Sequence, residues 1–142
     1  IETFILNQID LAKSSITMLV FWFTWKPIAD RLNQAAKRGV DVKMILDSRS
    51  AEIKMKDVHP TNETLIPNYL SNCKVHIYDG ELLHHKTILI DEDTVLTGTC
   101  NFFNASINRH EENYMLIKSR ELKKCFEKRY ELLLHKSKEW KQ

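Results

Sequence analysis

Residue types that could act together on a phosphate ester are grouped near the middle of the chain. They follow the spacing H-x-K-x4-D-x6-G-T-x-N and are His84, Lys86, Asp91, Gly98, Thr99 and Asn101. A phosphodiester is anionic and resists attack. A site that cleaves it therefore needs a nucleophile, an acid for the leaving oxygen, and cations or donors for the non-bridging oxygens. The pattern supplies an imidazole, an ammonium group and an amide, which are side chains suited to these roles.

Strand geometry separates the candidates within this stretch. Residues 83–90 are predicted to form a strand, in which side chains two positions apart share a face. His84 and Lys86 therefore point the same way, whereas His85 and Asp91 have the opposite parity. We predict His84 as the nucleophile rather than His85. Asp91 is predicted to be structural, holding its turn or a nearby backbone group.

Lys86 and Asn101 are the predicted ligands of the phosphate group. The ammonium group of Lys86 places a fixed positive charge beside the phosphate oxygens. Asn101 follows a turn at Gly98 and can donate an amide hydrogen bond to the same oxygens. Gly98 is thus predicted to be a structural member of the motif.

Aromatic residues beside the motif are candidates for contacting a substrate. Phe102 and Phe103 follow the motif directly, and one of them is expected to line the mouth of the site. We predict Phe102 as substrate-binding, together with the Thr99 hydroxyl. Trp22 could also stack on a base, although core packing is the simpler expectation for it.

The complete pattern resembles the HKD signature of the phospholipase D superfamily without a gap. Parts of residues 26–47 resemble the first βαβ unit of its small, single-motif nucleases, and Glu112 and Asn113 resemble their downstream Glu-Asn strand. The resemblance covers about residues 1–140, and residues 48–62 match least.

The resemblance also implies roles beyond the motif. It makes Glu112 the carboxylate that orients the histidine, whereas strand parity puts its competitor Glu111 on the opposite face. The mechanism needs two histidines and the chain has one motif, and the small members pair two identical chains. We therefore expect a homodimer. Its single site would contain two copies of His84, Lys86, Asn101 and Glu112, with no cofactor or metal ion.

The expected activity is that of a metal-independent endonuclease that cleaves DNA, or RNA as the second choice, through a phosphohistidine. One alternative is a phospholipase D-type hydrolase of cardiolipin or phosphatidyl lipids. Against it, the sequence shows no amphipathic membrane-binding stretch, and no stable membrane association is expected. Another alternative is a degenerate nucleic-acid-binding module, which the intact motif disfavours.

Composition places the chain among ordinary globular domains. It has 142 residues, 43% hydrophobic and 28% charged, with a net charge of +2. We expect a single domain over 1–142, cut or processed from a longer chain because it starts at Ile1 rather than Met. Residues 118–142 carry nine basic and four acidic side chains, so the basic excess is local. Three widely spaced cysteines indicate reduced thiols and a cytoplasmic location.

The order of predicted elements indicates an α/β fold with a mixed, largely parallel sheet of about six to seven strands flanked by helices. Residues 48–62 are predicted as a loop, either a surface insertion or a lid facing the substrate. Helices are expected at 2–13, 27–38, 63–70 (interrupted by Pro67) and 119–140. Strands are expected at 15–24, 40–46, 74–78, 83–90, 94–96 and 112–117.

Overall fold

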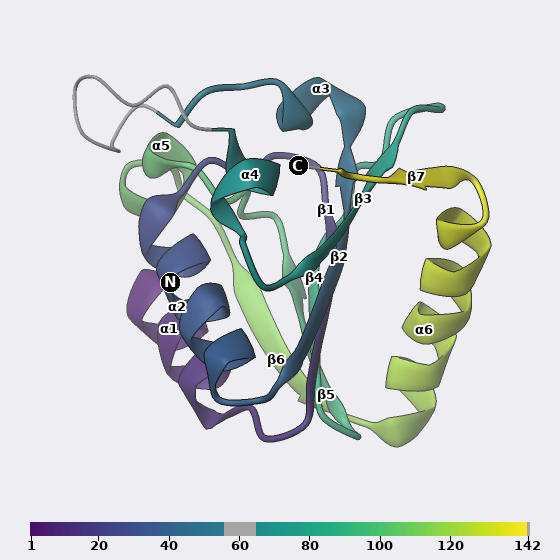
Figure 1. Cartoon of the computed structure of the whole chain (residues 1–142). Coiled ribbons are helices and arrows are strands. Elements are labelled where there is room, and N and C mark those ends of the chain that lie inside the picture. Colours follow the sequence, from purple (N-terminus) through teal and green to yellow (C-terminus); the bar gives the residue numbers. More distant parts are fainter. Residues whose placement is uncertain (56–64, 142) are drawn as a thin grey trace.

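The computed structural model describes residues 1–55 and 65–141, and it has a seven-stranded sheet with helices on both sides (Figure 1). The strands are β1 (Ser15–Val20), β2 (Asp41–Asp47), β3 (Lys74–Tyr78), β4 (Lys86–Ile90), β5 (Thr94–Gly98), β6 (Tyr114–Lys118) and β7 (Ser137–Glu139). The helices are α1 (Glu2–Leu11), α2 (Lys26–Lys37), α3 (Ser48–Ala51), α4 (Ile66–Tyr69), α5 (Asn104–Asn108) and α6 (Arg120–Leu134).

The sheet is mixed, and its strand order is β6-β5-β4-β1-β2-β3-β7. The pairs β1–β2 and β2–β3 are parallel, as the predicted βαβ unit requires. The other four pairs are antiparallel. The predicted α/β class is therefore confirmed, but the parallel part is limited to three strands. The turn between β4 and β5, residues 91–93, is too short for a crossover, so these two strands have to be antiparallel.

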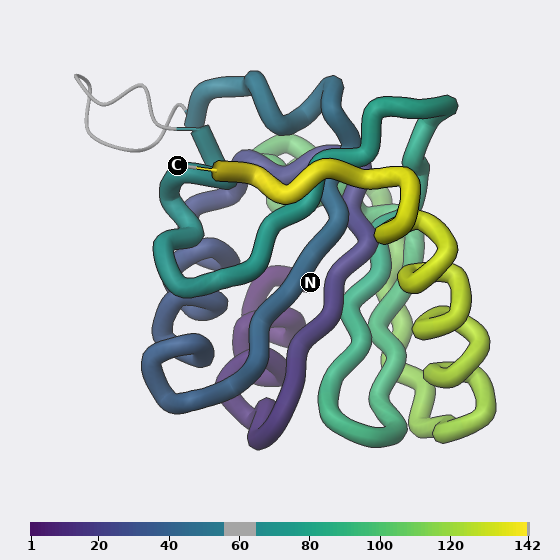
Figure 2. Tube along the Cα trace, turned by 45° about the vertical axis from the view of Figure 1, so that its right-hand side comes forward, coloured from purple at the N-terminus to yellow at the C-terminus, as the bar shows by residue number. Residues whose placement is uncertain are grey.

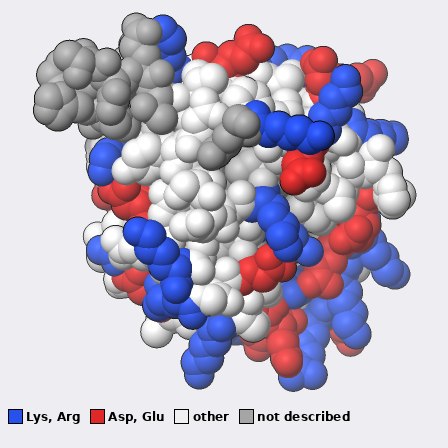
Figure 3. Space-filling model, in the orientation of Figure 1, with Lys and Arg blue, Asp and Glu red and all other residues white. Residues whose placement is uncertain are grey.

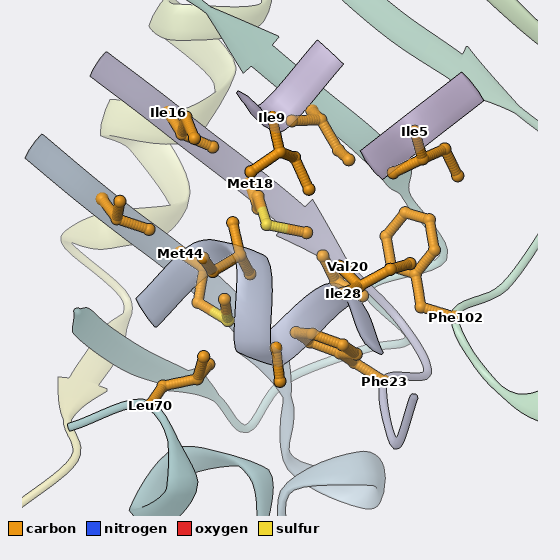
Figure 4. Packing of buried hydrophobic residues seen from close by; sticks show 14 of the residues in the cluster. Ile5, Ile9, Ile16, Met18, Val20, Phe23, Ile28, Met44, Leu70 and Phe102 are labelled. Atoms are coloured by element: carbon orange, nitrogen blue, oxygen red, sulfur yellow. The ribbon is translucent and has the colours of Figure 1, made fainter. Parts of the chain in front are cut away.

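Two helices cover one face of the sheet and form the main core. Helix α2 begins with Pro27 in its first turn and ends before Gly39, whose φ of +95° suits a residue without a side chain. Its apolar stripe includes Ile28 and Leu32, both fully buried. Met18 of β1 belongs to the same buried hydrophobic cluster as these two residues (Figure 4). The amphipathic pattern of α2 thus directs its packing on the parallel strands.

Helix α6 covers the opposite face and ends earlier than predicted. Ser119 caps it, with its Oγ accepting from the Leu122 backbone N–H at 3.1 Å. The helix stops at Leu134, and residues 137–139 then form β7 along β3 (Figure 2). The prediction of a helix through residue 140 was wrong because the open edge of β3 offers backbone partners to the end of the chain.

The surface of α6 is not a uniformly basic stripe. Lys123 pairs with Glu127 one turn later, and Arg120 contacts Glu92 at 2.8 Å. Figure 3 shows basic and acidic side chains intermixed on the α6 side of the molecule. The local excess of positive charge is therefore partly neutralised where it occurs.

The segment around residues 48–62 contains more structure than predicted. Asp47 caps the short helix α3 by accepting from the Arg49 backbone N–H at 2.9 Å. Pro67 lies in the first turn of α4, where a missing N–H is harmless, so it does not interrupt a helix. Residues 56–62 of the predicted loop or lid lie outside the described residues.

Asp91 ties the turn after β4 to the start of β1. Its carboxylate accepts hydrogen bonds from the backbone N–H groups of Lys13, Ser14 and Ser15, at 2.8–3.2 Å. Burial works to raise its pKa, but these donors and the Ser14 hydroxyl outweigh it, so the pKa of Asp91 lies below its ordinary value. Its φ of +52° also suits Asp better than most residues. This end of β4 is opposite to the end that carries Lys86.

We predict that Asp91→Asn lowers the free energy of unfolding at pH 7 by about 1–2 kcal/mol, because a charged acceptor of several N–H groups becomes neutral. A lowered folded-state pKa adds stability above the unfolded value of about 3.9, and this is lost as pH falls through the folded-state pKa. Urea unfolding should therefore show a smaller drop in stability from pH 7 to pH 3 in the variant. Glu92→Gln, in the same turn, serves as the control, and an equal effect of both changes would contradict the assignment.

Candidate active site

The motif lies where β1 and β5 finish and β4 and β6 begin. This line of strand ends is the edge of the sheet that carries the candidate site. Lys86 at the start of β4 pairs with Val20 at the end of β1. Ile88 pairs with Leu96 in β5, so Lys86 lies level with Gly98, which in turn pairs with Tyr114. Residues just outside these strand ends are therefore neighbours in space although they are far apart in sequence.

His84 and Lys86 are adjacent, and their environments differ sharply. The His84 side chain is exposed, and its ring lies 5.0 Å from the Phe21 ring, centroid to centroid. Lys86 is only 7% exposed, and its Nζ donates to the His84 backbone carbonyl at 2.8 Å. Within residues 1–55 and 65–141, no hydrogen bond engages the His84 imidazole. The ring is thus available to a ligand beside a fixed cation.

Strand parity correctly separated the two neighbouring histidines. The His85 ring turns to the other side and lies 6.4 Å from the Phe126 ring of α6. Burial is the main cause that lowers the pKa of His85, and the nearby Arg129 adds to it. His85 therefore belongs to the α6 side of the sheet.

Lys86 is a desolvated cation. Burial lowers the pKa of its ammonium group, and the negative charge of Glu112 partly opposes this. The Nζ lies 5.5 Å from the centroid of the Phe21 ring. A poorly hydrated cation interacts strongly with an approaching anion, because little bound water has to be displaced.

Asn101 has an uncommitted amide. Its backbone N–H donates to the Ser106 Oγ at 2.9 Å, which fixes the main chain. Its Oδ1 is buried without a hydrogen-bond partner among the described residues. Buried polar groups are normally paired. As an oxygen, Oδ1 can only accept, so a ligand would have to donate to it, whereas phosphate oxygens would be bound by the Nδ2 of the same amide.

Glu112 is held by hydroxyl groups instead of by the histidine. Thr99 Oγ1 donates to one carboxylate oxygen, and Ser106 Oγ donates to the other at 2.9 Å. The Thr99 bond is the largest cause that lowers the pKa of Glu112; burial opposes it, and Ser106, His110 and Lys86 also lower it. Among the described residues of one protomer, Glu112 makes no hydrogen bond to His84. The predicted orienting contact is thus absent within a single chain.

The structure treats the two predicted substrate-binding residues differently: it buries Phe102, so that prediction needs correction, and it leaves Thr99 exposed, so that one stays a prediction. Phe102 is fully buried and packs on Phe23 and Tyr114, so its ring cannot contact a substrate (Figure 4). Phe103, the other candidate, is the half-exposed member of the pair. The Thr99 hydroxyl also accepts from the Asn113 backbone N–H at 3.1 Å, so internal contacts already use it.

Gly98 is needed for close approach of two strands. A Cβ at this position would lie 2.2 Å from the Asn113 carbonyl oxygen of the chain entering β6. Such a clash with backbone cannot be relieved by a side-chain rotation. The absence of a side chain therefore lets the Thr99 and Asn113 segments pair at the edge of the site.

Several residues at this edge were missed from the sequence. Ser106 is one, because a serine five residues after the motif has no distinctive spacing. Phe21 and Arg109 are others. A cavity of about 580 Å³ is lined by both of them and by Trp22, Asn101 and Phe103. Phe21 follows β1 directly, and only the β1–β4 register shows that it lies beside His84.

The described residues lack two further features. They contain no group of three or more His, Cys, Asp and Glu side chains placed to hold a metal ion. None of the helices they form is both long and apolar enough to cross a membrane.

The fold is an α/β domain with the motif at one end of its central strands. A family model described as "Cardiolipin synthase, PLD-like domain" matches residues 5–134. The chain therefore belongs to this family of the phospholipase D superfamily, as the sequence predicted.

Similar proteins differ in how much of their length the chain covers. It is 33% identical to Phospholipase D of Rickettsia felis over 87% of this chain and 58% of that protein. It is 29% identical to Minor cardiolipin synthase ClsB of Bacillus subtilis, covering 28% of it. The crystal structure of Nuc, a phospholipase D family member from Salmonella typhimurium, superposes with a TM-score of 0.85 at 28% identity, covering 99% of this chain and 90% of Nuc. The chain thus spans little more than half the length of the first of these relatives.

We predict that Thr99→Val raises the pKa of Glu112 toward its ordinary value and lowers the free energy of unfolding by about 1–2 kcal/mol, because a donor and an acceptor are both lost. Thr99→Ser keeps the hydroxyl and should change neither quantity much. Carboxyl ¹³C titration by NMR and urea unfolding measure the two effects. A Glu112 pKa that is equal in both variants would refute the role of the hydroxyl.

Proposed function

We propose that this protein is a metal-independent endonuclease that cleaves nucleic acid, DNA in preference to RNA, at a site shared by two copies of the chain. The observation that carries the proposal is the unengaged imidazole of His84 beside the buried ammonium group of Lys86. Nucleophilic attack on an anionic phosphodiester needs both a free nucleophile and a cation that neutralises the phosphate.

The proposed reaction has two steps. In the first, the imidazole of His84 attacks phosphorus, a P–N bond forms and the P–O bond to the leaving group breaks. The leaving oxygen takes a proton from the partner's His84, which acts as general acid. In the second step, that imidazole removes a proton from water, the water attacks phosphorus, and the P–N bond breaks to release the product. Lys86 and Asn101 bind the non-bridging oxygens throughout.

The need for a second chain follows from what one protomer lacks. No hydrogen bond holds the His84 imidazole within the described residues, and no second histidine of the motif is present to act as the acid. A twofold pairing of this edge would supply both an acid and an orienting carboxylate from the partner's Glu112. An isologous interface is the usual way in which one surface patch forms such a symmetric site.

We propose nucleic acid as the substrate because this chain corresponds to a small, single-motif member of the superfamily over its whole length. The chain and Nuc match over nearly the whole length of both, and their identity is 28%. The sequence also resembles the small, single-motif nucleases of the superfamily. The proposed site needs no metal ion, because its own lysine side chains supply the positive charge.

A lipid phosphodiester is the second candidate, and the names of relatives favour it. The matching family is described as cardiolipin synthase, and the Rickettsia relatives are named phospholipase D. The chemistry at phosphorus would be the same, so the residues that contact the phosphate do not separate the two substrates.

A quenched cleavage assay tests the proposal. Single-stranded DNA, duplex DNA, RNA and cardiolipin vesicles are supplied with excess EDTA to the wild type, His84→Ala and the control His85→Ala. We expect DNA cleavage by the wild type and by His85→Ala. Because a P–N bond is labile in acid and stable in base, quenching with alkaline SDS should trap a covalent protein–oligonucleotide adduct that His84→Ala does not form. Lipid turnover without nucleic-acid cleavage would favour the second candidate, and cleavage by His84→Ala would remove its assigned role.

Subunit mixing tests the shared site. Because each dimer would have one site, an excess of His84→Ala should suppress wild-type activity well beyond simple dilution after subunit exchange. Sedimentation equilibrium should show a dimer at micromolar concentration. A fully active monomer would contradict the shared site.

A further inference from the structure

A row of aromatic rings leads away from His84 along the edge of the sheet. Neighbouring ring centroids are 5.0, 5.8, 6.1 and 6.0 Å apart. In order, the rings are those of His84, Phe21, Trp22, Phe103 and His110. All five are half-buried or exposed. Every neighbouring pair is tilted or edge-on, an arrangement that aromatic pairs favour.

The exposure of the middle rings is unusual for their position. Val20 and Phe23 are fully buried, whereas Phe21 and Trp22 between them keep part of their surface in solvent. Packing of the core alone would bury large aromatic side chains at the end of a central strand. Rings left partly open beside a reactive histidine are better explained by a ligand that covers them.

Three of these rings border a cavity beside the candidate active site. The cavity has a volume of about 580 Å³, and Phe21, Trp22 and Phe103 line it. Asn101 and Phe21 both line this cavity. Asn101 is also a predicted phosphate ligand, and Phe21 contacts His84 and Lys86. His84 and Lys86 line a separate cavity of about 470 Å³. A substrate whose phosphate lies at His84 would therefore reach the aromatic cavity by passing Phe21.

Positive charge accompanies the rings. Arg109 and Lys54 both line the cavity. Arg109 is exposed, and no acidic side chain in the described part of the chain pairs with it. Aromatic faces combined with cations are what proteins use to bind unpaired nucleotides, since bases stack on rings and phosphates contact cations.

We infer that this aromatic cavity binds the unpaired base next to the scissile phosphate, and that the protein acts on single-stranded nucleic acid. The inference rests on the proposed function and adds the substrate class. Bases in a duplex already stack on their neighbours, so only an unpaired base offers a free face to Trp22 or Phe103. An acyl chain would leave Arg109 and the Asn101 amide without partners, and for this reason a lipid fits the cavity less well.

Binding measurements in the non-cleaving His84→Ala background test the inference. Fluorescence anisotropy follows a labelled single-stranded oligonucleotide, a duplex of the same length and phosphatidylglycerol vesicles. Stacking contributes about 1–3 kcal/mol per base, so Phe103→Leu should weaken single-strand binding about tenfold. Phe103→Tyr keeps an aromatic face and should bind as the parent does. Phe4→Leu, a half-exposed change on α1 outside the cavity, is the matched control.

Two further readouts separate base contact from general loss of structure. Binding of the single strand should quench tryptophan fluorescence, and Trp22→Phe should remove most of this quenching while keeping the fold. Arg109→Gln should reduce the slope of log affinity against log salt by about one, as expected for a lost phosphate contact.

The outcomes distinguish this inference from the proposed function. If no nucleic acid is bound or cleaved, the proposed function itself fails. If cleavage occurs but Phe103→Leu and Phe4→Leu bind the single strand equally well, only the cavity assignment is overturned. Equal binding of duplex and single strand, or a loss in Phe103→Leu confined to vesicles, would also overturn it.

Discussion

The antiparallel pairing of β1 with β4 is the contact on which the arrangement of this molecule depends. It joins the parallel half of the sheet to the antiparallel half and sets Val20 opposite Lys86. The Phe21 backbone N–H continues the pairing by donating to the His85 carbonyl at 2.8 Å. A slip of one residue would turn the motif toward α6 and separate its members. The well-filled core on the α1–α2 face makes this register costly to change.

The electrostatics of the edge follow from that register. A buried cation, Lys86, and a carboxylate, Glu112, influence each other, and each favours the charged form of the other. The carboxylate is further held by two hydroxyl groups, so it is anchored as well as charged. The site therefore keeps a compensated pair of charges before any substrate arrives. Among the described residues, the imidazole of His84 takes no part in these hydrogen bonds.

Sequence reasoning succeeded where a local rule decided the outcome. Spacing identified the motif, and strand parity placed His84 and His85 on different sides. Sequence reasoning failed where packing between residues far apart in the sequence determined the outcome. Phe102 and Phe103 are equivalent by local rules, and only the fold around Phe23 and Tyr114 buries the first. Similarly, β7 forms because β3 has an open edge, which no pattern in residues 137–139 reveals. The contacts of Glu112 depend on Thr99, which the pairing of β5 with β6 brings close, and on Ser106, which lies in α5 between these two strands.

The remaining question for this fold is how it would distinguish phosphodiesters that share the same reacting group. The residues that can contact a phosphate, His84, Lys86 and Asn101, cannot tell a lipid from a nucleotide, because the phosphate is identical in both. Discrimination must come from groups that contact what flanks the phosphate. At this edge those groups are aromatic rings and the exposed Arg109 guanidinium, supplied by the residues after β1 and before β6. These segments lie outside the strands, so they can vary without disturbing the register that places His84. Substrate choice and chemistry would then be encoded in separate parts of the same edge.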